Sequence, residues 1–433
     1  MSAMPEATDS PLSEATYVTN TEVVLDPVKP ATGKNAWKAL AVAPRALWFG
    51  YGTVVLAEPI DPEFRQYAAD LGFESDVVIP AGVNPEALSI LDGQNDPAFQ
   101  AAIGGGKLVE SYAAHAALGQ IVEANGGTYF IDQPDSAVQA NDKGRYASLM
   151  EGIVEAPDGE LAKGIEAITD AVVDRLKRDG KAYVRHTASG AGFGNRGFDL
   201  GQTPDLTRDQ IRETIEGEHP ELWTDAEALV EEYLILIHAL AVGFDRRGFT
   251  HDNLQITHGG KYWGAWSPIP EDIWDPTELR HIGEKGAATL RRLTGYNGRG
   301  SNDIALTPDG LIGLENNARD TAMRHPIAIA TRLFNTPWDQ WRTVGHTIKT
   351  IDNLVLKSPM SFTEIRATLG KAGLLASTKS PHGIIITIPP HGNVAGIQAQ
   401  ENGYRRTEGL FQEALKLIGD EAANRYDNAY QPK

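Results

Sequence analysis

The sequence predicts an α/β protein, with an open parallel sheet near the N-terminus and a mixed α+β region after it. Between about residue 45 and residue 135, short apolar segments alternate with helical ones. This is the pattern of a parallel sheet whose faces are covered by helices. From about residue 228 several strand-like segments follow one another, and one pair has the turn of a hairpin. At 433 residues the chain has room for two to four domains.

The first region is expected to hold four strands and four helices. Residues 1–15 are rich in Ser, Pro, Ala and Glu, which predicts a mobile tail. Three of the helices begin at Asp or Asn followed by Pro, because such a side chain caps the first turn and proline fits its first position. The expected strands are Val54–Ala57, Asp76–Pro80, Lys107–Glu110 and Gly127–Asp132, and the helices begin at Asp61, Asn84, Asp96 and Ala113.

The remaining chain mixes helices and strands. Ser136–Gly152 and Ala162–Leu176 have helical spacing, and Thr207-Arg-Asp-Gln210 has the spacing of a capping box. The run Ala228–Ile237 is too apolar for a surface helix and predicts a buried strand. Further strands are expected at Ala182–His186, Ala239–Phe244, Leu254–Thr257, Lys261–Ala265 and Gly383–Ile388, further helices at Pro276–Leu293, Trp338–Leu356, Phe362–Gly370 and Arg406–Tyr426, and a loop at Pro389–Gln400.

The clearest local signal is the turn Thr307-Pro-Asp-Gly310. Proline pre-sets φ at the second position, and glycine accepts a positive φ at the fourth. If the last three of these residues form the loop of a hairpin, Thr307 pairs with Leu311. Counting outward then places Asp303 opposite Glu315, and Asn317 lies two residues further on the same face.

Two carboxylates directly opposite each other on one sheet face repel. The arrangement is explained if a hard divalent cation lies between Asp303 and Glu315, with the amide oxygen of Asn317 as a third ligand. The alternative is a solvated acidic face with the pairing one residue out of register. The hairpin alone leaves both interpretations open.

Two glycine-rich segments match nucleotide-binding loops only in part. Gly192–Gly197 fits G-x-G-x-x-G after a strand, but the residues that follow do not open a helix, as a dinucleotide site requires. Gly104–Lys107 lacks the first glycine and the Ser or Thr of a Walker A loop. A glycine loop between two strands, at Ser189–Asn195, can instead bring backbone N–H groups close to phosphate, with Arg185 just upstream. An ordinary surface loop is the alternative.

The charge balance limits the partners. The formal net charge is −19 and the pI is about 5.0. Because such a field repels nucleic acid and anionic membrane, neither is an expected partner. The absence of cysteine excludes disulfides, thiolate metal sites and a cysteine nucleophile, and fits a cytoplasmic protein. No apolar run has the length of a membrane span, and the N-terminus lacks the pattern of a signal peptide.

Taken in order, these parts resemble the ATP-grasp superfamily between about residues 45 and 330. The matching parts are the open α/β domain, the lysine of Asn141-Asp-Lys143, Arg185 before the glycine loop, the strand Val230-Glu-Glu-Tyr-Leu234, and the acidic hairpin ending in Glu315-Asn-Asn-Ala-Arg319. The resemblance implies a pre-ATP-grasp domain over residues 16–135, a small lobe over 136–225, a large lobe with the metal hairpin over 226–335, and a C-terminal α/β extension over 336–433.

The resemblance also implies a role for each matching residue. Considered singly, each of these residues also has a purely structural interpretation, such as a lysine exposed to solvent or a surface ion pair. The implied ATP-binding residues are Lys143, Arg185, Ser189, Gly190, Gly192, Gly194, Glu231, Glu232 and Leu234; the implied magnesium ligands, which could also hold manganese, are Asp303, Glu315 and Asn317; and the implied catalytic residues are Arg319 and Arg185.

Two positions depart from the family pattern. The family usually has lysine where Arg185 stands, and many members place an acid for ribose where this chain has His238. The Ser-Gly-x-Gly-x-Gly-Asn loop and the complete α/β pre-domain look most like the pheganomycin-type peptide ligases. Those enzymes join a carboxylate to an amino acid or peptide amine in bacterial secondary metabolism.

The resemblance therefore implies an ATP-dependent carboxylate–amine ligase. It would form an amide through an acyl phosphate, release ADP and phosphate, and take a small-molecule acid and an amino acid or peptide amine as partners. The alternatives are a kinase or thiol ligase of the same fold, an NAD(P)-dependent dehydrogenase that uses Gly192–Gly197, and a non-catalytic nucleotide-binding module. The oligomeric state is open, with a homodimer among the expected assemblies. His391 either lines the site or belongs to a structural turn.

Overall fold

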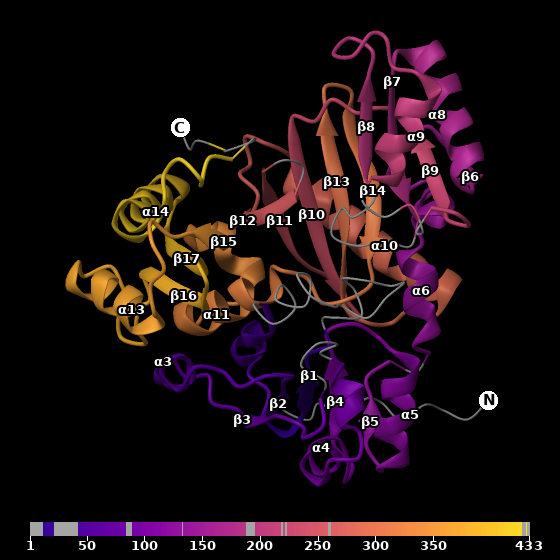
Figure 1. Cartoon of the computed structure of the whole chain (residues 1–433). Coiled ribbons are helices and arrows are strands. Elements are labelled where there is room, and N and C mark those ends of the chain that lie inside the picture. Colours follow the sequence, from indigo (N-terminus) through magenta and orange to yellow (C-terminus); the bar gives the residue numbers. More distant parts are fainter. Residues whose placement is uncertain are drawn as a thin grey trace.

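The computed structural model describes residues 12–20, 42–83, 89–131, 133–187, 195–217, 220, 223–258, 261–426 and 430. Within these residues the chain forms three β-sheets with helices packed around them (Figure 1). No described helix combines the length and the apolar character that crossing a membrane requires. Most of the predicted tail, residues 1–11, and the helix start predicted at Asn84 lie outside the described residues.

The N-terminal part is an open parallel sheet of five strands in the order β3-β2-β1-β4-β5 (Figure 1, indigo to purple). The predicted parallel α/β class is confirmed. Asp61 and Asp96 cap their helices as expected, accepting backbone N–H groups at 2.8 and 2.6 Å. The elements are β1 Thr16–Val18, β2 Thr53–Val55, β3 Asp76–Val78, β4 Leu108–Ser111 and β5 Thr128–Tyr129, with η1 Leu12–Glu14, η3 Ala43–Phe49, α3 Pro62–Asp70, η4 Ile90–Gly93, α4 Pro97–Ile103 and α5 Ala116–Ala124.

A four-stranded antiparallel sheet forms the small lobe, in the order β6-β9-β7-β8. The predicted capping box is present, since the side chains and backbone groups of Thr207 and Gln210 bond reciprocally. The lobe and its lead-in comprise α6 Asp135–Asn141, η5 Lys143–Arg145, α7 Tyr146–Leu149, β6 Gly159–Lys163, α8 Ile165–Asp179, β7 Lys181–His186, β8 Arg196–Asp199, α9 Arg208–Glu216 and β9 Glu227–Glu231.

The large lobe is one antiparallel sheet of eight strands, in the order β14-β13-β10-β11-β12-β15-β17-β16. Its last three strands come from the C-terminal hundred residues, so that segment continues the sheet (Figure 1, orange to yellow). The elements are β10 His238–Asp245, β11 Gly248–His258, β12 Lys261–Ser267, α10 Pro276–Thr294, β13 Gly300–Thr307, β14 Gly310–Asn317, α11 Arg324–Phe334, η7 Trp338–Gln340, α12 Trp341–Val344, β15 His346–Val355, α13 Phe362–Lys371, β16 Gly383–His391, β17 Val394–Asn402 and α14 Tyr404–Ile418.

The helix predicted over Trp338–Leu356 is wrong. The helical segment there ends at Val344, where Gly345 takes a left-handed conformation with φ 83°. The following residues are rich in β-branched side chains, which favour a pleated strand over a helix. They form β15 inside the large sheet.

The strand predicted over Ala228–Ile237 is half as long as expected. Its ladder ends at Glu231, because the neighbouring strand β6 begins at Gly159, the partner of Glu231. The chain then leaves the sheet, and Ile235 is 65% exposed. The prediction of a buried strand is therefore wrong beyond Glu231, because it rested on apolar character alone.

Two further predictions near the C-terminus need correction. The predicted loop Pro389–Gln400 is a hairpin between β16 and β17, and the adjacent prolines are tolerated because β16 is the edge strand of the sheet. His391 is the last residue of β16 and pairs with Val394. The final helix ends at Ile418, earlier than the predicted Tyr426.

Trp48 joins the N-terminal part to the large sheet. Its side chain is fully buried, and its indole N–H donates to the carbonyl oxygen of Thr387 in β16 at 2.8 Å. The ring packs edge-on against Phe64 and Phe73, with centroids 5.7 and 5.3 Å away. Such buried aromatic contacts contribute beyond the area they cover. The N-terminal sheet is thereby fixed against the lobe that carries the acidic hairpin.

Replacing Trp48 tests this connection. Trp48→Ala should lower the free energy of unfolding by about 3–5 kcal/mol, because it leaves a large cavity. Trp48→Phe retains most of the packing, so its loss should be about 1–2 kcal/mol, reflecting the unpaired carbonyl of Thr387. Urea unfolding followed by circular dichroism measures both values. Equal losses in the two variants would contradict a packing role for the indole.

Candidate active site

The acidic hairpin has the predicted pairing at its functional end. Asp303 lies directly opposite Glu315, as expected. The turn itself is one residue tighter than predicted, since Thr307 pairs with Gly310 and not with Leu311. A β-bulge between the turn and the acidic pair restores the register. The predicted pairing of the two acids is therefore right, although the turn that led to it is not.

The bulge leaves Leu314 without a partner residue across the ladder. Its carbonyl oxygen accepts a hydrogen bond from Nη1 of Arg185 at 2.9 Å. The next residue back, Gly313, donates its N–H to the carbonyl oxygen of Glu155 at 2.7 Å. Backbone groups released by the bulge are thus satisfied from the small lobe and its lead-in. This fixes the hairpin relative to the strand that carries Arg185.

Neutral side chains donate hydrogen bonds to Asp303. Its Oδ2 accepts from the amide of Asn317 at 3.0 Å, and its Oδ1 accepts from Gln255 at 3.3 Å and from the hydroxyl of Ser301 at 3.4 Å. Ser301 and Asn317 are paired across the hairpin, one step along the same face. The side chains therefore share one face of the large sheet, as predicted.

The second carboxylate is surrounded by cations. Nζ of Lys143 lies 3.3 Å from Glu315. The Asn-Asp-Lys context explains this placement, because Asn141 accepts the N–H of Ala318 at 2.6 Å through its side chain. One end of the motif is thereby held on the strand that carries Glu315. The structure brings Lys143 to the acidic hairpin from more than 170 residues away in sequence.

The two acids have opposite pKa shifts. Burial, together with the facing Glu315, raises the pKa of Asp303 to about 7. Burial opposes ionisation of Glu315 too, but Lys143, Arg185 and Arg319 outweigh it and hold its pKa below the usual value. At neutral pH the pair therefore carries an ionised carboxylate beside one that readily exchanges a proton. A divalent cation relieves this repulsion directly.

The donor set fits magnesium better than a soft metal. The described residues include no group of three or more His, Cys, Asp or Glu side chains that could hold a metal ion by themselves. Mg²⁺ does not need one, because it binds through one or two carboxylates and takes its other ligands from phosphates and water. The carboxylates Asp303 and Glu315, with the amide oxygen of Asn317, are the predicted ligands that could supply such a partial shell. In the structure that oxygen accepts a hydrogen bond from Arg319.

Arg185 forms the tightest ion pair of the site. Its Nε and Nη2 atoms each donate to Glu231 at 2.6 Å, and both side chains are buried. A bidentate pair of this kind fixes the plane of the guanidinium. Lysine, with a single charged nitrogen, cannot also reach the carbonyl of Leu314 in this way. The departure from the family pattern at Arg185 thus has a structural role here.

The segment after β9 connects the two lobes. Glu232 donates its N–H to the carbonyl of Asp158 at 2.9 Å, so this N–H already has a partner within the protein. Leu234 follows in irregular backbone, and apolar side chains are exposed immediately beyond it. Exposed apolar residues in this segment are Tyr233, Ile235, Leu236 and Ile237. Contiguous exposed apolar patches are a feature of interaction sites and ligand-binding grooves.

The predicted phosphate loop lies outside the described residues, including Ser189, Gly190, Gly192 and Gly194. The strands on either side, β7 and β8, pair antiparallel. Because Gly197 lies within β8, the G-x-G-x-x-G match leads into a strand and not into a helix. A dinucleotide site requires a helix directly after this motif, so the segment does not match one.

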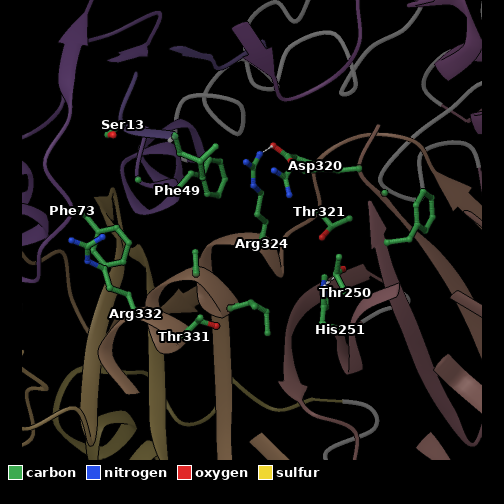
Figure 2. A pocket seen from close by; sticks show the side chains of 17 residues that line it. Ser13, Phe49, Phe73, Thr250, His251, Asp320, Thr321, Arg324, Thr331 and Arg332 are labelled. Atoms are coloured by element: carbon green, nitrogen blue, oxygen red, sulfur yellow. Dashed lines mark hydrogen bonds and ion pairs between the residues drawn. The ribbon is translucent and has the colours of Figure 1, made fainter. Parts of the chain in front are cut away.

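A cavity of about 650 Å³ adjoins the acidic hairpin, and sequence reasoning missed it (Figure 2). It lies between η3 of the N-terminal part, the start of β13, and α11. Its polar lining includes His251, Arg299 and Arg324. None of these belongs to a recognisable motif, so only the folded chain brings them together.

Comparisons with known proteins identify the fold. No protein-family model matches the chain, and no curated protein matches its sequence significantly. Biotin carboxylase from Campylobacter jejuni, solved with β-γ-ATP, matches with a TM-score of 0.61 and 13% identity over 94% of this chain and 91% of that one. The biotin carboxylase domain of 2-oxoglutarate carboxylase from Hydrogenobacter thermophilus, solved with MgADP and bicarbonate, gives 0.59 and 12% over 94% and 90%.

A second group of structures agrees. N5-carboxyaminoimidazole ribonucleotide synthetase from Thermus thermophilus matches with a TM-score of 0.54 and 14% identity, covering 94% of this chain and 99% of that one. Biotin carboxylases and these synthetases are ATP-grasp enzymes. At such low identity the likeness shows the fold alone. The predicted architecture, a parallel-sheet domain followed by an ATP-grasp fold, is confirmed.

The raised pKa of Asp303 gives a pH-dependent prediction. A raised carboxyl pKa contributes stability below the ordinary carboxyl range, and this is lost as the pH rises toward about 7. Asp303→Asn removes the loss, so it should raise the melting temperature of the metal-free protein more at about pH 8 than at about pH 5. Magnesium should raise the melting temperature of the wild type alone. A variant less stable than wild type at both pH values would contradict the facing-carboxylate account.

Proposed function

From the ATP-grasp fold, we propose that the chain is an ATP-dependent carboxylate–amine ligase. One observation carries the proposal. Asp303 and Glu315 face each other on the large lobe. Lys143 lies against Glu315, and Arg185 donates to the carbonyl oxygen of Leu314 on the same hairpin. Two acids and two cations at one point suit a nucleotide triphosphate bridged by a divalent cation.

The nucleotide would lie between the small and large lobes. Lys143 and Arg185 would contact its phosphates, and the loop containing Ser189–Gly194 would cover them. The carbonyl of Glu232 and the N–H of Leu234 would contact the adenine edge, with Glu231 holding Arg185 in place as it does in the structure. Magnesium, which manganese could replace, would be held by Asp303, Glu315 and Asn317, where it would neutralise phosphate charge.

The proposed reaction needs positioning more than it needs a protein nucleophile. An oxygen of the acid substrate attacks the γ-phosphorus, the bond to the β-phosphate oxygen breaks, and ADP leaves. The amine nitrogen then attacks the acyl carbon, phosphate leaves, and the amine proton passes to solvent or to the phosphate. Arg319 would stabilise charge on the transferred group, since it already lies beside Asn317. Arg185 would contribute a fixed second charge.

The finer proposal is an acid–amino acid or peptide ligase of the pheganomycin type. The glycine-loop sequence and the complete pre-domain support it. The amine would be an amino acid or a short peptide, with a cytoplasmic location and a homodimer as working expectations. A kinase or thiol ligase with the same fold would use the same nucleotide site, and a nucleotide-binding module would bind without turnover. Because Gly197 lies within β8 and does not lead into a helix, the dehydrogenase is disfavoured.

Removing one metal carboxylate tests the function. Glu315→Gln is isosteric and should reduce ADP formation by about a hundredfold or more, as loss of a main electrostatic contributor does. Asp309→Asn, at the exposed turn of the same hairpin, is the matched control and should keep full activity. A coupled ADP assay with magnesium and a panel of acids and amines measures both. Substantial turnover by Glu315→Gln would contradict the site.

The dependence of ADP release on the acceptor substrate distinguishes the competing reactions. A ligase should release ADP fastest when both an acid and an amino acid or peptide are present, and mass spectrometry should detect the amide. ADP release with an acid alone and a stable phosphorylated product would favour the kinase. A thiol-dependent product would favour the thiol ligase. Binding of MgATP with no release of ADP under any combination would favour the nucleotide-binding module.

A further inference from the structure

The cavity beside the hairpin has a cationic lining in an acidic protein. Its charged lining residues are three arginines and one acid: Arg299, Arg324, Arg332 and Asp320. The whole chain carries a formal charge of −19, so this lining runs against the overall balance. A concave, locally positive site concentrates anions. Its volume of about 650 Å³ is in the range of small-molecule sites.

The arginines differ in how many donors they have already used. Arg324 donates to Asp320, to the hydroxyl of Tyr51 at 2.6 Å and to Glu110 at 3.1 Å, and its guanidinium stacks on Phe49 at 4.2 Å. These contacts fix Arg324 as part of the wall (Figure 2). Arg324 therefore holds the wall of the cavity in place, and its guanidinium is poorly suited to turn toward a ligand.

Arg299 is held loosely by comparison. Its contacts with Glu110 are 3.4 and 3.5 Å long and its nearest approach to Asp245 is 4.0 Å, all at or beyond the limit of a good hydrogen bond. Its side chain is 31% exposed. A guanidinium has five N–H donors in a fork that matches a carboxylate. Arg332, the third lining arginine, stacks on Phe73 at the far side of the cavity, so Arg299 is the arginine beside the hairpin that is suited to bind an anionic group.

His251 supplies a second polar group. The residue is 7% exposed, its Nδ1 lies 3.0 Å from the hydroxyl of Thr250, and within the described chain its Nε2 is buried without a hydrogen-bond partner. Burial lowers its pKa to about 4, so the ring is neutral at physiological pH. A buried polar atom without a partner is uncommon, and a catalytic role or a bound water or ion is among its explanations. The ring lies over Gly243, where any Cβ would come 2.1 Å from it.

The sheet register places these two residues next to the proposed metal ligands. His251 pairs with Gly243, and Gly243 pairs with Ser301. The hydroxyl of Ser301 donates a hydrogen bond to Asp303. Arg299 immediately precedes the same strand, β13. The polar side of the cavity therefore lies on the sheet face that carries the metal carboxylates.

The opposite side of the cavity is lined mainly by apolar side chains, with Arg332 of α11 stacked on Phe73 at 5.0 Å. Phe49 and Phe73 line it from the N-terminal part, and Ile327 and Ala328 line it from α11. Figure 2 shows Phe49 and Phe73 across the cavity from Thr250 and His251. Aromatic walls of this kind favour a flat apolar group. A ligand with one anionic end and one apolar end fits this division.

We propose that this cavity binds the acid substrate, and that the acid is a carboxylate with a ring-sized apolar body. Arg299 and His251 bind the carboxylate near the metal hairpin, and the apolar body lies between Phe49 and Phe73. This assignment rests on the proposed ligase function for the fate of the acid. The binding itself needs no turnover, so it is tested independently.

Calorimetry in the presence of MgADP tests the proposal with two probes, phenylacetate and acetate. Phenylacetate should bind at least about tenfold more tightly, since burying a ring adds apolar contact. Arg299→Gln should weaken phenylacetate binding by about ten- to a hundredfold, as loss of a charged hydrogen bond does, with MgADP affinity unchanged. Arg247→Gln is the matched control, because Arg247 also contacts Asp245 but is 84% exposed. It should bind both probes as wild type does.

Two further variants separate binding from folding. Arg299→Lys keeps the charge beside Glu110, so it should fold normally and still lose most of the affinity that depends on a bidentate contact. Phe49→Leu should reduce the preference for phenylacetate and leave acetate binding unchanged. Equal binding of the two probes, no binding of either, or full affinity in both Arg299 variants would overturn the proposal. None of these results would alter the outcome of the Glu315→Gln assay, which tests the function alone.

Discussion

Two facing carboxylates impose the main constraint on this structure. Asp303 and Glu315 lie on neighbouring strands where like charges repel, and both are largely withdrawn from water. A fold keeps such a pair only when something compensates for it. Lys143, Arg185 and Arg319 provide part of the compensation: all three lower the pKa of Glu315, and Arg319 also lowers that of Asp303. The remaining imbalance, expressed as the raised pKa of Asp303, is what a bound cation would remove.

The relation between the lobes follows from the same site. The β-bulge beside the acidic pair frees the carbonyl of Leu314, and Arg185 binds it from the small lobe. Arg185 is in turn fixed by Glu231, the last residue of β9, so one side chain spans the hairpin and the strand that leads to the inter-lobe segment. On the other side, Trp48 and the N-terminal sheet close against the large lobe. The cavity lies between the N-terminal part and the large lobe, at the start of β13 (Figure 2).

Features set by a few neighbouring residues could be predicted from the sequence, whereas features that depend on contacts between distant segments could not. The helix caps and the presence of a turn at residues 307–310 follow from rules that act over a few residues, whereas the pairing of the two acids also needs a β-bulge that offsets the tighter turn. The β-bulge was not foreseeable, because it depends on contacts from another lobe. The same limit explains the errors over Ala228–Ile237 and Trp338–Leu356, where apolar spacing fits more than one structure. His251 and Arg299 carry no motif at all, and only the sheet register brings them to one cavity.

The most direct test of the central claim is a crystal structure of the protein with Mg²⁺ and ADP. The account predicts magnesium bound by carboxylate oxygens of both Asp303 and Glu315 at about 2.0–2.1 Å, with a phosphate oxygen completing the bridge. Arg319 should then have released the side-chain oxygen of Asn317. A structure in which ADP binds elsewhere, or in which the two carboxylates keep their present contacts without a metal between them, would contradict the account.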